Sequence, residues 1–338
     1  MRAYEIRDAF GLENLKIVER AVPEPGPGQV RVRMKCISLN YRDILMTRGL
    51  YNPRQPLPLI PCSDGVGVVD AVGEGVYRVK PGDRVSGIFA QKWLAGKPTR
   101  AALTSTLGGP LDGTLTELMV LSEEGVVKVP DYLTDEEAST LPCAALTAWT
   151  SLVVEGGVTA GDRVLVQGTG GVSVFALQIA KMLGAEVIVT SSSDDKLEKA
   201  SAMGADHTIN YSTHRKWSEE VMRLTNKEGV DLVVEVGGAG TIDQSIRSVR
   251  PGGHISMIGI LSGGSQELLL TRVLMQNIRI QGILVGHRDG FEAMNRAFAL
   301  HQIRPAVDRV FAFDEAVRAM EFVASGKHFG KVCVRIAE

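Results

Sequence analysis

Apolar and polar positions follow two different rhythms along this chain of 338 residues. In the first third, segments such as 29–39 and 65–73 are rich in β-branched residues and partly alternate between apolar and polar positions. Stretches of turn residues, such as PEPGPG and KPGD, separate such segments. This pattern is typical of strands joined by turns. It predicts a sheet or barrel-like domain at the start of the chain.

Near residue 134 the pattern changes to strands that alternate with helices. Thr134 and Glu137 form a capping-box signature for a helix that ends near Pro142. Beyond it, short apolar runs, most of them separated by helical segments, predict six strands at 163–167, 186–191, 207–210, 231–236, 254–259 and 278–285. Such alternation favours a parallel, doubly wound sheet of the Rossmann type.

The chain beyond about residue 286 carries two helical segments and a last strand, KVCVRI. These pieces are too few for a third domain, so we expect them to return to the first one. The length of the chain also favours two domains. The predicted organisation is a β-rich domain of residues 1–128 and 286–338, and an α/β domain of residues 129–285.

Composition narrows the partners and the location. The net charge of −2 indicates neither a nucleic-acid partner nor a membrane surface. No apolar run reaches the roughly 18 residues of a membrane span, and the N-terminus lacks the apolar core of a signal peptide, so we expect a cytoplasmic protein. The cysteines are scattered without a CxxC pair, which indicates neither a disulfide framework nor a cysteine-rich zinc lobe: Cys36, Cys62, Cys143 and Cys333.

The stretch VQGTGGVS lies between a predicted strand and a predicted helix. Gly168, Gly170 and Ser173 occupy the three positions of a GxGxxG-type turn, which need a tight bend, a close approach of the backbone to a pyrophosphate, and a small residue for packing. Gly171 and Val172 follow the turn, and the N-terminal N–H groups of the helix are expected to bind the anion. The context predicts a dinucleotide site, with an ordinary glycine-rich loop as the alternative.

The end of the second strand of the α/β domain indicates which nucleotide is bound. NAD sites usually carry an acidic residue there, whereas this chain has Ser191 and Ser192. A hydroxyl group can donate to a 2′-phosphate, and Lys196 adds positive charge. Tyr211 can stack on the adenine or reach the same phosphate. We therefore expect NADPH, with an NAD ribose held by one of the two aspartates of SSSDDK as the alternative.

Eight motifs are spread over almost the whole chain: LNYRD, RGLY, PCSDGVGVV, KPGDRV, LPCAALTAW, VQGTGGVS, GADHTINY and VGGAG. Together with the order of the domains, they resemble the medium-chain dehydrogenase/reductase superfamily, and within it the zinc-free quinone oxidoreductases related to zeta-crystallin. The resemblance implies a GroES-like catalytic domain and an inserted Rossmann domain.

The resemblance also bears on metal binding. The zinc-dependent alcohol dehydrogenases of the superfamily hold their catalytic metal with Cys, His and Cys, and the corresponding positions here are Asn40, Ser63 and Cys143. Neutral amide and hydroxyl oxygens are poor zinc ligands. The region 92–113, which corresponds to the four-cysteine lobe of those enzymes, contains no cysteine. We therefore expect no metal ion, and Cys143 as a small buried residue rather than a reactive thiol.

The candidate catalytic residues are Asn40, Tyr51 and Asp43. By the resemblance, Asn40 faces the nicotinamide and the substrate, where its amide can hydrogen-bond the ribose, the carboxamide or a substrate carbonyl; a turn or cap residue is the alternative. Tyr51 either walls the pocket and donates through its hydroxyl or packs at the surface. We expect Asp43 to orient its neighbours through hydrogen bonds.

The nicotinamide end of the cofactor is expected at the carboxyl ends of the strands, where an open α/β sheet binds its ligand. Thr147 resembles a family residue that meets the nicotinamide. The backbone groups expected to line the same pocket belong to Gly237, Ile258, Gly259, Leu284, Val285 and Gly286. His287 and Arg288 are further candidate donors, although charges in loops are usually solvated.

These features predict an NADPH-dependent oxidoreductase that transfers hydride, without a metal, to a quinone or an α,β-unsaturated carbonyl compound. Such electron-poor acceptors need less electrophilic assistance than a simple ketone. The alternatives are a reductase of another activated alkene such as an enoyl thioester, and a nucleotide-binding protein with little turnover. The apolar stretch QELLLTRVLMQN favours a homodimer, because relatives pair subunits through that region; core packing is the alternative.

Overall fold

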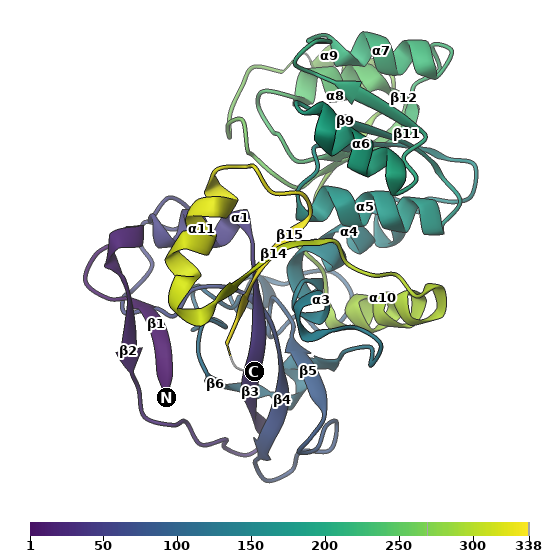
Figure 1. The fold of residues 1–338 in the computed structure, drawn as a ribbon. Coiled ribbons are helices and arrows are strands. Elements are labelled where there is room, and N and C mark those ends of the chain that lie inside the picture. Colours follow the sequence, from purple (N-terminus) through teal and green to yellow (C-terminus); the bar gives the residue numbers. More distant parts are fainter. Residues whose placement is uncertain (269, 337–338) are drawn as a thin grey trace. The chain divides into compact units, whose positions relative to one another are not determined.

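The computed structural model describes residues 1–268 and 270–336, and the chain divides into two compact units (Figure 1). The first unit comprises Met1–Leu146 and Val285–Glu338, and the second comprises Thr147–Leu284. The expected boundary at residue 128 therefore differs from the observed one. Segment 129–146 lies in the first unit because its helix α3 (Asp135–Ser139) packs on the main sheet of that unit.

The first unit is built on a seven-stranded sheet with the order β14-β15-β3-β4-β5-β7, in which β6 also pairs with β3. All pairs are antiparallel except β14 with β15. The strands are β3 (Gln29–Leu39), β4 (Asp64–Val72), β5 (Arg84–Gly87), β6 (Leu118–Ser122), β7 (Val126–Lys128), β14 (Val307–Ala312) and β15 (Lys331–Arg335). A separate antiparallel pair is formed by β1 (Arg2–Ile6) and β2 (Leu15–Glu19).

The predicted return of the C-terminal segment to the first domain is confirmed. In the register of β15 against β3, Val332 lies opposite Leu39, near the carboxyl end of β3. This pairing places the first residue of β15 beside the loop that follows β3.

Helices complete the first unit. Thr134 caps α3, since its hydroxyl accepts from the backbone N–H of Glu137 at 3.2 Å, as the capping-box signature predicts. The other helices are α1 (Tyr41–Thr47), α2 (Arg100–Leu103), α10 (Arg288–His301) and α11 (Ala316–Ala324). The 3₁₀ turns are η1 (Leu12–Asn14), η2 (Glu123–Gly125) and η5 (Phe313–Glu315), and η3 (Leu141–Ala145) is a π-helical segment.

The second unit is a six-stranded parallel sheet with the order β10-β9-β8-β11-β12-β13, which confirms the predicted doubly wound fold. Each of its strands overlaps one of the six predicted ones, although β12 begins earlier and β13 is shorter than predicted: β8 (Arg163–Gln167), β9 (Glu186–Ser191), β10 (His207–Asn210), β11 (Val230–Glu235), β12 (Val249–Met257) and β13 (Arg279–Gly282). The central strands are almost wholly buried, which explains their continuous apolar runs.

The helices of the second unit connect these parallel strands. They are α5 (Gly171–Met182), α6 (Asp194–Ala202), α7 (Trp217–Leu224), α8 (Ile242–Ser248) and α9 (Leu270–Met275). The segment that enters this unit contains α4 (Leu146–Trp149) and η4 (Thr150–Val154). None of the helices within the described part of the chain is long and apolar enough to cross a membrane.

The strand order of the second unit reverses between β8 and β11. The chain runs outward from β8 through β9 to β10 and then returns to the other side of β8. In open α/β sheets the crevice outside the carboxyl ends of the strands at such a reversal is where ligands bind. The loops after β8 and β11 are therefore expected to border a binding site.

Candidate functional site

The glycine turn after β8 has the geometry that a dinucleotide site requires. Gly168 has a φ of 71°, in the left-handed region, and its N–H donates to the carbonyl of Thr190 at 2.8 Å. The buried hydroxyl of Ser173 donates to the carbonyl of Gln167 at 2.7 Å and ties α5 to the end of β8. Serine therefore serves as the small third residue of the motif.

Gly170 leaves open space at the start of α5. It precedes the helix, and a Cβ added there would meet no atom within 4 Å. Space of this kind allows a phosphate to approach the backbone closely. Gly171 and Val172 form the first turn of α5, where the N-terminal end of the helix dipole favours an anion. The residues predicted to cradle a pyrophosphate thus fit that group.

A buried carboxylate holds the loop after β11 in place. Glu235 is fully buried at the end of the strand, and it accepts from the backbone N–H groups of Gly237 and Gly238 at 2.8 and 2.9 Å. The hydroxyl of Thr241 donates to the same oxygen at 2.6 Å, and the hydroxyl of Ser245 donates to the other one. This loop is therefore shaped by charge-assisted hydrogen bonds rather than left to the solvent.

The same carboxylate joins the two strands that flank the reversal of the sheet. The amide nitrogen of Gln167, the last residue of β8, donates to Glu235 at 2.7 Å. The amide oxygen of Gln167 accepts from the N–H groups of Val236 and Gly237 at 3.3 and 3.4 Å. The glycine turn and the loop after β11 are thereby fixed with respect to each other. The sequence analysis did not single out either residue, although a glutamate inside the apolar run DLVVEV was a visible signal.

The loop after β12 lies against the loop after β11. The N–H of Ile258 donates to the carbonyl of Glu235 at 2.8 Å, and a Cβ on Gly259 would come within 2.4 Å of the carbonyl oxygen of Val236. Gly237 accepts through its carbonyl from the N–H of Ser262 at 2.7 Å. The structure therefore brings together three of the residues predicted to line the nicotinamide pocket.

The other predicted nicotinamide residues lie near the boundary of the units. Thr147 is the first residue of the second unit and is buried, and Leu284 is its last residue. Val285 and Gly286 belong to the first unit. Val285 has a φ of 53°, which a β-branched residue rarely adopts. Their role towards a cofactor stays a prediction.

The four residues predicted to select the nucleotide surround the carboxyl ends of β9 and β10. Ser191 is buried and its hydroxyl accepts from the N–H of Ser193 at 3.3 Å, while Ser192 is exposed. The N–H of Tyr211 donates to the carbonyl of Ser191 at 3.0 Å, and 41% of Tyr211 is exposed. Lys196 lies in the first turn of α6.

The alternative prediction was that one of the two aspartates of SSSDDK binds the ribose of NAD. One of these aspartates has a hydrogen bond within the protein. The carboxylate of Asp194 accepts from the amide of Asn210 at 2.7 Å. Such a carboxylate already has a hydrogen-bond partner at the end of β10. An ionised carboxylate has further acceptor positions, so this bond by itself does not decide between the serines and Asp194 as the contacts of a ribose.

In the first unit, Asn40 stands at the start of α1 and is partly exposed. Its side-chain oxygen accepts from the ammonium of Lys331 at 2.6 Å, and its side-chain nitrogen donates to the hydroxyl of Ser63 at 3.5 Å. The Ser63 hydroxyl in turn donates to Asp64 at 2.7 Å. Asn40 therefore precedes α1, as expected of the cap residue that was the alternative interpretation. Its side chain also belongs to a polar cluster.

Asp64 is the buried end of this cluster. Its second carboxylate oxygen accepts from the backbone N–H of Cys143 at 3.1 Å. Burial raises the pKa of Asp64, and the ammonium of Lys331 and the hydrogen bond from Ser63 oppose that effect. Burial, together with Asp64, raises the pKa of the Cys143 thiol well above its usual range, which disfavours the thiolate form that a nucleophile needs.

Asp43 has the orienting role that the sequence analysis expected. One of its oxygens accepts from the backbone N–H of Asn40 at 2.8 Å and so caps α1. The other oxygen has no hydrogen-bond partner within the described structure. Complete burial raises the pKa of Asp43 to about 7, and the neighbouring Arg42 guanidinium opposes this rise.

Tyr51 is half exposed and is held beside α1 by Arg42. The guanidinium of Arg42 lies 5.1 Å from the centroid of the Tyr51 ring and 4.8 Å from that of Phe89. It also donates to the carbonyls of Leu107 and Gly109 at 2.8 and 2.6 Å. The Tyr51 ring is therefore positioned by a cation–π contact, whichever molecule its hydroxyl meets.

The two charged candidates after Gly286 have structural partners. The Nδ1 atom of His287 accepts from the N–H of Gly290 at 2.9 Å and caps α10. The guanidinium of Arg288 pairs with Glu124. The indole of Trp93 lies edge-on to the His287 ring, with centroids 5.9 Å apart. These contacts favour packing roles for the three residues.

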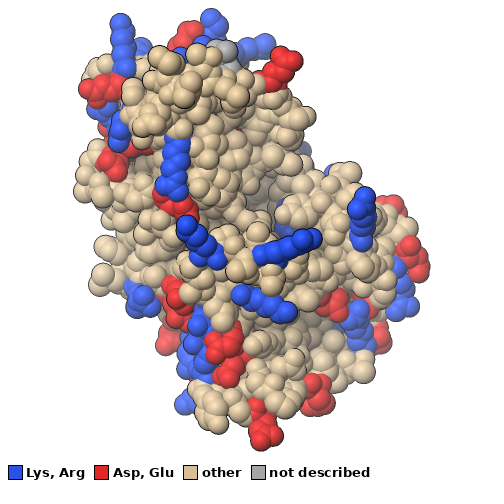
Figure 2. Space-filling model, turned by 180° about the vertical axis from the view of Figure 1, so that it is seen from behind, with Lys and Arg blue, Asp and Glu red and all other residues tan. Residues whose placement is uncertain are grey.

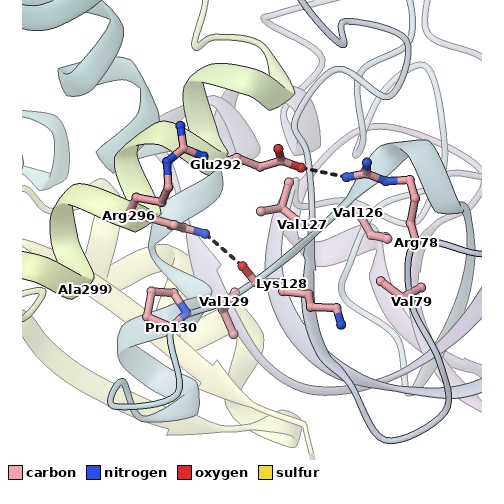
Figure 3. A pocket seen from close by; sticks show the side chains of 11 residues that line it. Arg78, Val79, Val126, Val127, Lys128, Val129, Pro130, Glu292, Arg296 and Ala299 are labelled. Carbon is pink, nitrogen blue, oxygen red and sulfur yellow. Dashed lines mark hydrogen bonds and ion pairs between the residues drawn. The ribbon is translucent and has the colours of Figure 1, made fainter.

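A separate hollow of about 440 Å³ lies between β7 and α10. Figure 3 shows the valines and the proline that line it, and Arg78 paired to Glu292 at 2.7 Å. The amide of Asn295, which also lines the hollow, donates to the carbonyl of Lys128. None of the predicted site residues lines it. It is therefore distinct from the predicted site.

The donor set around Asn40 does not suit a zinc ion. The oxygen of Asn40 already binds an ammonium, and the hydroxyl of Ser63 is a donor to Asp64. Cys143 alone among the three corresponding positions has a side chain that zinc prefers. Within residues 1–268 and 270–336, no group of three or more His, Cys, Asp or Glu side chains is placed to hold a metal.

Comparison with known proteins agrees with this architecture. The family described as "Alcohol dehydrogenase GroES-like domain" matches residues 26–131, and "Zinc-binding dehydrogenase" matches residues 171–299. A "Zinc-type alcohol dehydrogenase-like protein" of Schizosaccharomyces pombe is 44% identical over 98% of this chain and 99% of its own length. The chain belongs to the medium-chain dehydrogenase/reductase family. This family member is an oxidoreductase.

Other relatives of this dehydrogenase/reductase differ in what their names say they do. An "Acryloyl-coenzyme A reductase" of Metallosphaera sedula is 34% identical over 92% of this chain and 93% of its own length. A solved "NAD-dependent alcohol dehydrogenase" covers 100% of both chains with a TM-score of 0.91 and 37% identity. A mycobacterial protein solved in complex with NADPH covers 99% of both chains with a TM-score of 0.84 and 26% identity.

The raised pKa of Asp43 predicts a pH-dependent effect of the substitution Asp43→Asn. Because folding raises this pKa from 3.8 to about 7, the associated stability is complete below the unfolded pKa and is lost as the pH rises through about 7. Asparagine stays neutral. We expect the free energy of unfolding of D43N, relative to the native protein, to increase by about 2 kcal/mol between about pH 5.5 and 8.5.

Urea unfolding at both pH values measures this difference. Asp131→Asn, at an exposed carboxyl, serves as the control, and its relative stability should stay constant. A D43N difference that is equally constant would show that Asp43 ionises normally.

Proposed function

We propose that this protein is an NADPH-dependent oxidoreductase that transfers hydride, without a metal ion, to a quinone or an α,β-unsaturated carbonyl compound. The observation that carries the proposal is the cluster of Asn40, Ser63, Asp64 and Lys331. It offers hydrogen-bond donors and a fixed positive charge where zinc relatives of the family offer metal ligands.

Bound NADPH supplies the hydride, which an electron-poor acceptor takes up at carbon. The negative charge then develops on a conjugated oxygen, and a proton follows from water. Donors aimed at that oxygen stabilise the transition state. The amide of Asn40 and the hydroxyl of Tyr51 are the donors that we assign to it, while Asp43 holds the start of α1.

The choice of NADPH rests on the second unit. Two serines, one of them exposed, stand at the end of β9, and Tyr211 and Lys196 lie beside them. The complex of a similar mycobacterial protein with NADPH supports this choice, whereas the name of the similar NAD-dependent dehydrogenase supports NADH. We favour NADPH because no acidic side chain ends β9.

An enoyl thioester is the second candidate substrate. The relative named as an acryloyl-coenzyme A reductase favours it, since its name describes reduction of an activated alkene. The chemistry required of this chain is the same in both cases, because an enoyl thioester also takes hydride at carbon and places charge on a conjugated oxygen. The two candidates therefore differ in the substrate pocket and not in the donors.

We further propose a homodimer formed through the edge of the second unit. Strand β13 ends the sheet, and large apolar side chains are exposed on or beside it: Leu270, Leu274, Met275 and Ile280. A second copy would cover them. Both basic and acidic side chains appear on the face of the molecule seen in Figure 2, and the net charge of −2 favours no nucleic-acid partner.

The proposed dimer predicts that a charge placed in its interface lowers the molar mass of the protein in solution. Leu274→Glu should shift the protein from dimer to monomer in multi-angle light scattering, because it places a charge among the apolar side chains. Leu300→Glu, at an equally exposed leucine of α10, should leave the dimer intact. A native protein that is monomeric at micromolar concentration would remove this proposal.

The proposed activity predicts oxidation of NADPH by a panel of quinones, enals and enoyl-coenzyme A thioesters. The rate should be unchanged after treatment with a metal chelator, and metal analysis should find no stoichiometric zinc. The measurement is the absorbance of the reduced nucleotide. Zinc that survives dialysis and is required for turnover would contradict the metal-free mechanism. Tight NADPH binding without oxidation by any acceptor would favour a binding protein.

The nucleotide assignment predicts the effect of Ser191→Asp. A carboxylate at the end of β9 repels a 2′-phosphate and accepts from ribose hydroxyls, so the ratio of kcat/KM for NADPH to that for NADH should fall on the order of tenfold or more. Ser201→Asp adds the same charge on the exposed face of α6 and should leave the ratio unchanged. An unaltered ratio in S191D would place the nucleotide's 2′ position elsewhere.

A further inference from the structure

We propose that Lys331 is a positioning residue, which fixes and polarises the Asn40 amide so that its NH₂ group can donate to the reacting molecule. This inference rests on the proposed function, because it gives Asn40 its orientation within the proposed site. Lys331 is the first residue of β15 and only 3% of it is exposed. Its ammonium donates to the carbonyl of Leu39 and to the side-chain oxygen of Asn40, both at 2.6 Å.

A buried ammonium is costly unless charges and hydrogen bonds compensate it. Two fully buried carboxylates, Asp43 and Asp64, provide that compensation, and the ammonium opposes the rise in the pKa of each. The guanidinium of Arg42 is the other cation facing Asp43. The charges are therefore nearly balanced, and removal of Lys331 would leave two carboxylates facing each other with one cation fewer.

The hydrogen bonds of the cluster run in one direction. Lys331 donates to Asn40, Asn40 donates to Ser63, and Ser63 donates to Asp64. An ammonium has no acceptor, so the atom of Asn40 that faces it must be the oxygen. The orientation of the amide is thereby determined by chemistry and not by the shape of the side chain, whose oxygen and nitrogen ends are nearly equal in size.

The consequence concerns the NH₂ group of Asn40. It donates to Ser63, and a hydrogen bond from the Asn40 side chain also helps to lower the pKa of Asp64. A cation at the amide oxygen withdraws electron density from the nitrogen, so the NH₂ group becomes a stronger donor. Because Asn40 is partly exposed whereas Lys331, Ser63 and Asp64 are buried, Asn40 is the member of the cluster that an incoming molecule can reach.

A merely structural role for Lys331 is the competing explanation. Its bond to the carbonyl of Leu39 joins β15 to β3 regardless of Asn40. That role predicts a loss of stability with Lys331→Met and a loss of activity that is independent of Asn40. Positioning through Asn40 predicts instead that the two residues act as a unit, which a double-mutant cycle measures.

The experiment compares Lys331→Met, Asn40→Ala and the double variant with the native enzyme, using NADPH and its best acceptor. We expect each single variant to lower kcat by on the order of tenfold to a hundredfold, as the loss of one oxyanion donor does. The double variant should be no slower than N40A, and Lys331→Arg, which keeps a charged donor, should recover part of the rate. Multiplicative losses in the double variant, or native kcat in K331M, would overturn the proposal.

Two controls separate this outcome from misfolding and from a wrong function. Lys327→Met, in the exposed turn before β15, should leave kcat unchanged, and thermal unfolding shows whether each variant is folded. The side-chain amide resonance of Asn40 in ¹⁵N-labelled protein is identified by its absence in N40A. K331M should shift it strongly even if no acceptor oxidises NADPH, so a failure of the proposed function leaves this readout intact. An unchanged resonance in folded K331M would overturn the proposal.

Discussion

The antiparallel pairing of β15 with β3 is the constraint on which the first unit depends. It joins residues almost three hundred positions apart and places the ammonium of Lys331 beside the side chain of Asn40. Without this register the carboxylates of Asp43 and Asp64 would be buried without the ammonium of Lys331, which opposes the rise in the pKa of each. The pairing thus helps to explain how the loop after β3 can hold polar groups away from water: Asn40, Ser63 and Asp64 are hydrogen-bonded to one another or to Lys331, and the charge of Lys331 also faces Asp43.

In the second unit a single buried anion holds the loops in place. Glu235 accepts hydrogen bonds from the N–H groups of a glycine loop and from the amide of Gln167. These bonds fix the two strand ends between which the sheet order reverses. Glycines that accept close contacts, such as Gly259, pack the neighbouring loop against it. In both units a buried charge shapes the loops, while the surrounding apolar strands supply the rigidity. Precise loops on rigid strands are what hydride transfer needs, because the reaction depends on the placement of two carbon atoms.

In the proposed function, this arrangement takes the place of a Lewis acid. A zinc ion provides a strong local positive charge at the substrate oxygen. Here the positive charge belongs to a side chain one hydrogen bond behind the donor. Such an arrangement offers weaker polarisation than a metal, which suits an acceptor that is already electron-poor. Quinones, enones and enoyl thioesters, the proposed acceptors, share that property.

The sequence by itself determined the fold class, the six strands of the parallel sheet, the glycine turn and the C-terminal return, because these follow from local periodicity, capping and turn chemistry. It also indicated Asn40, Asp43 and the serines after β9. Only the tertiary structure decided that segment 129–146 joins the first unit, that Gln167 binds Glu235 and that Lys331 binds Asn40. These depend on strand register and on which distant groups share a buried space, and no local pattern in the chain records either.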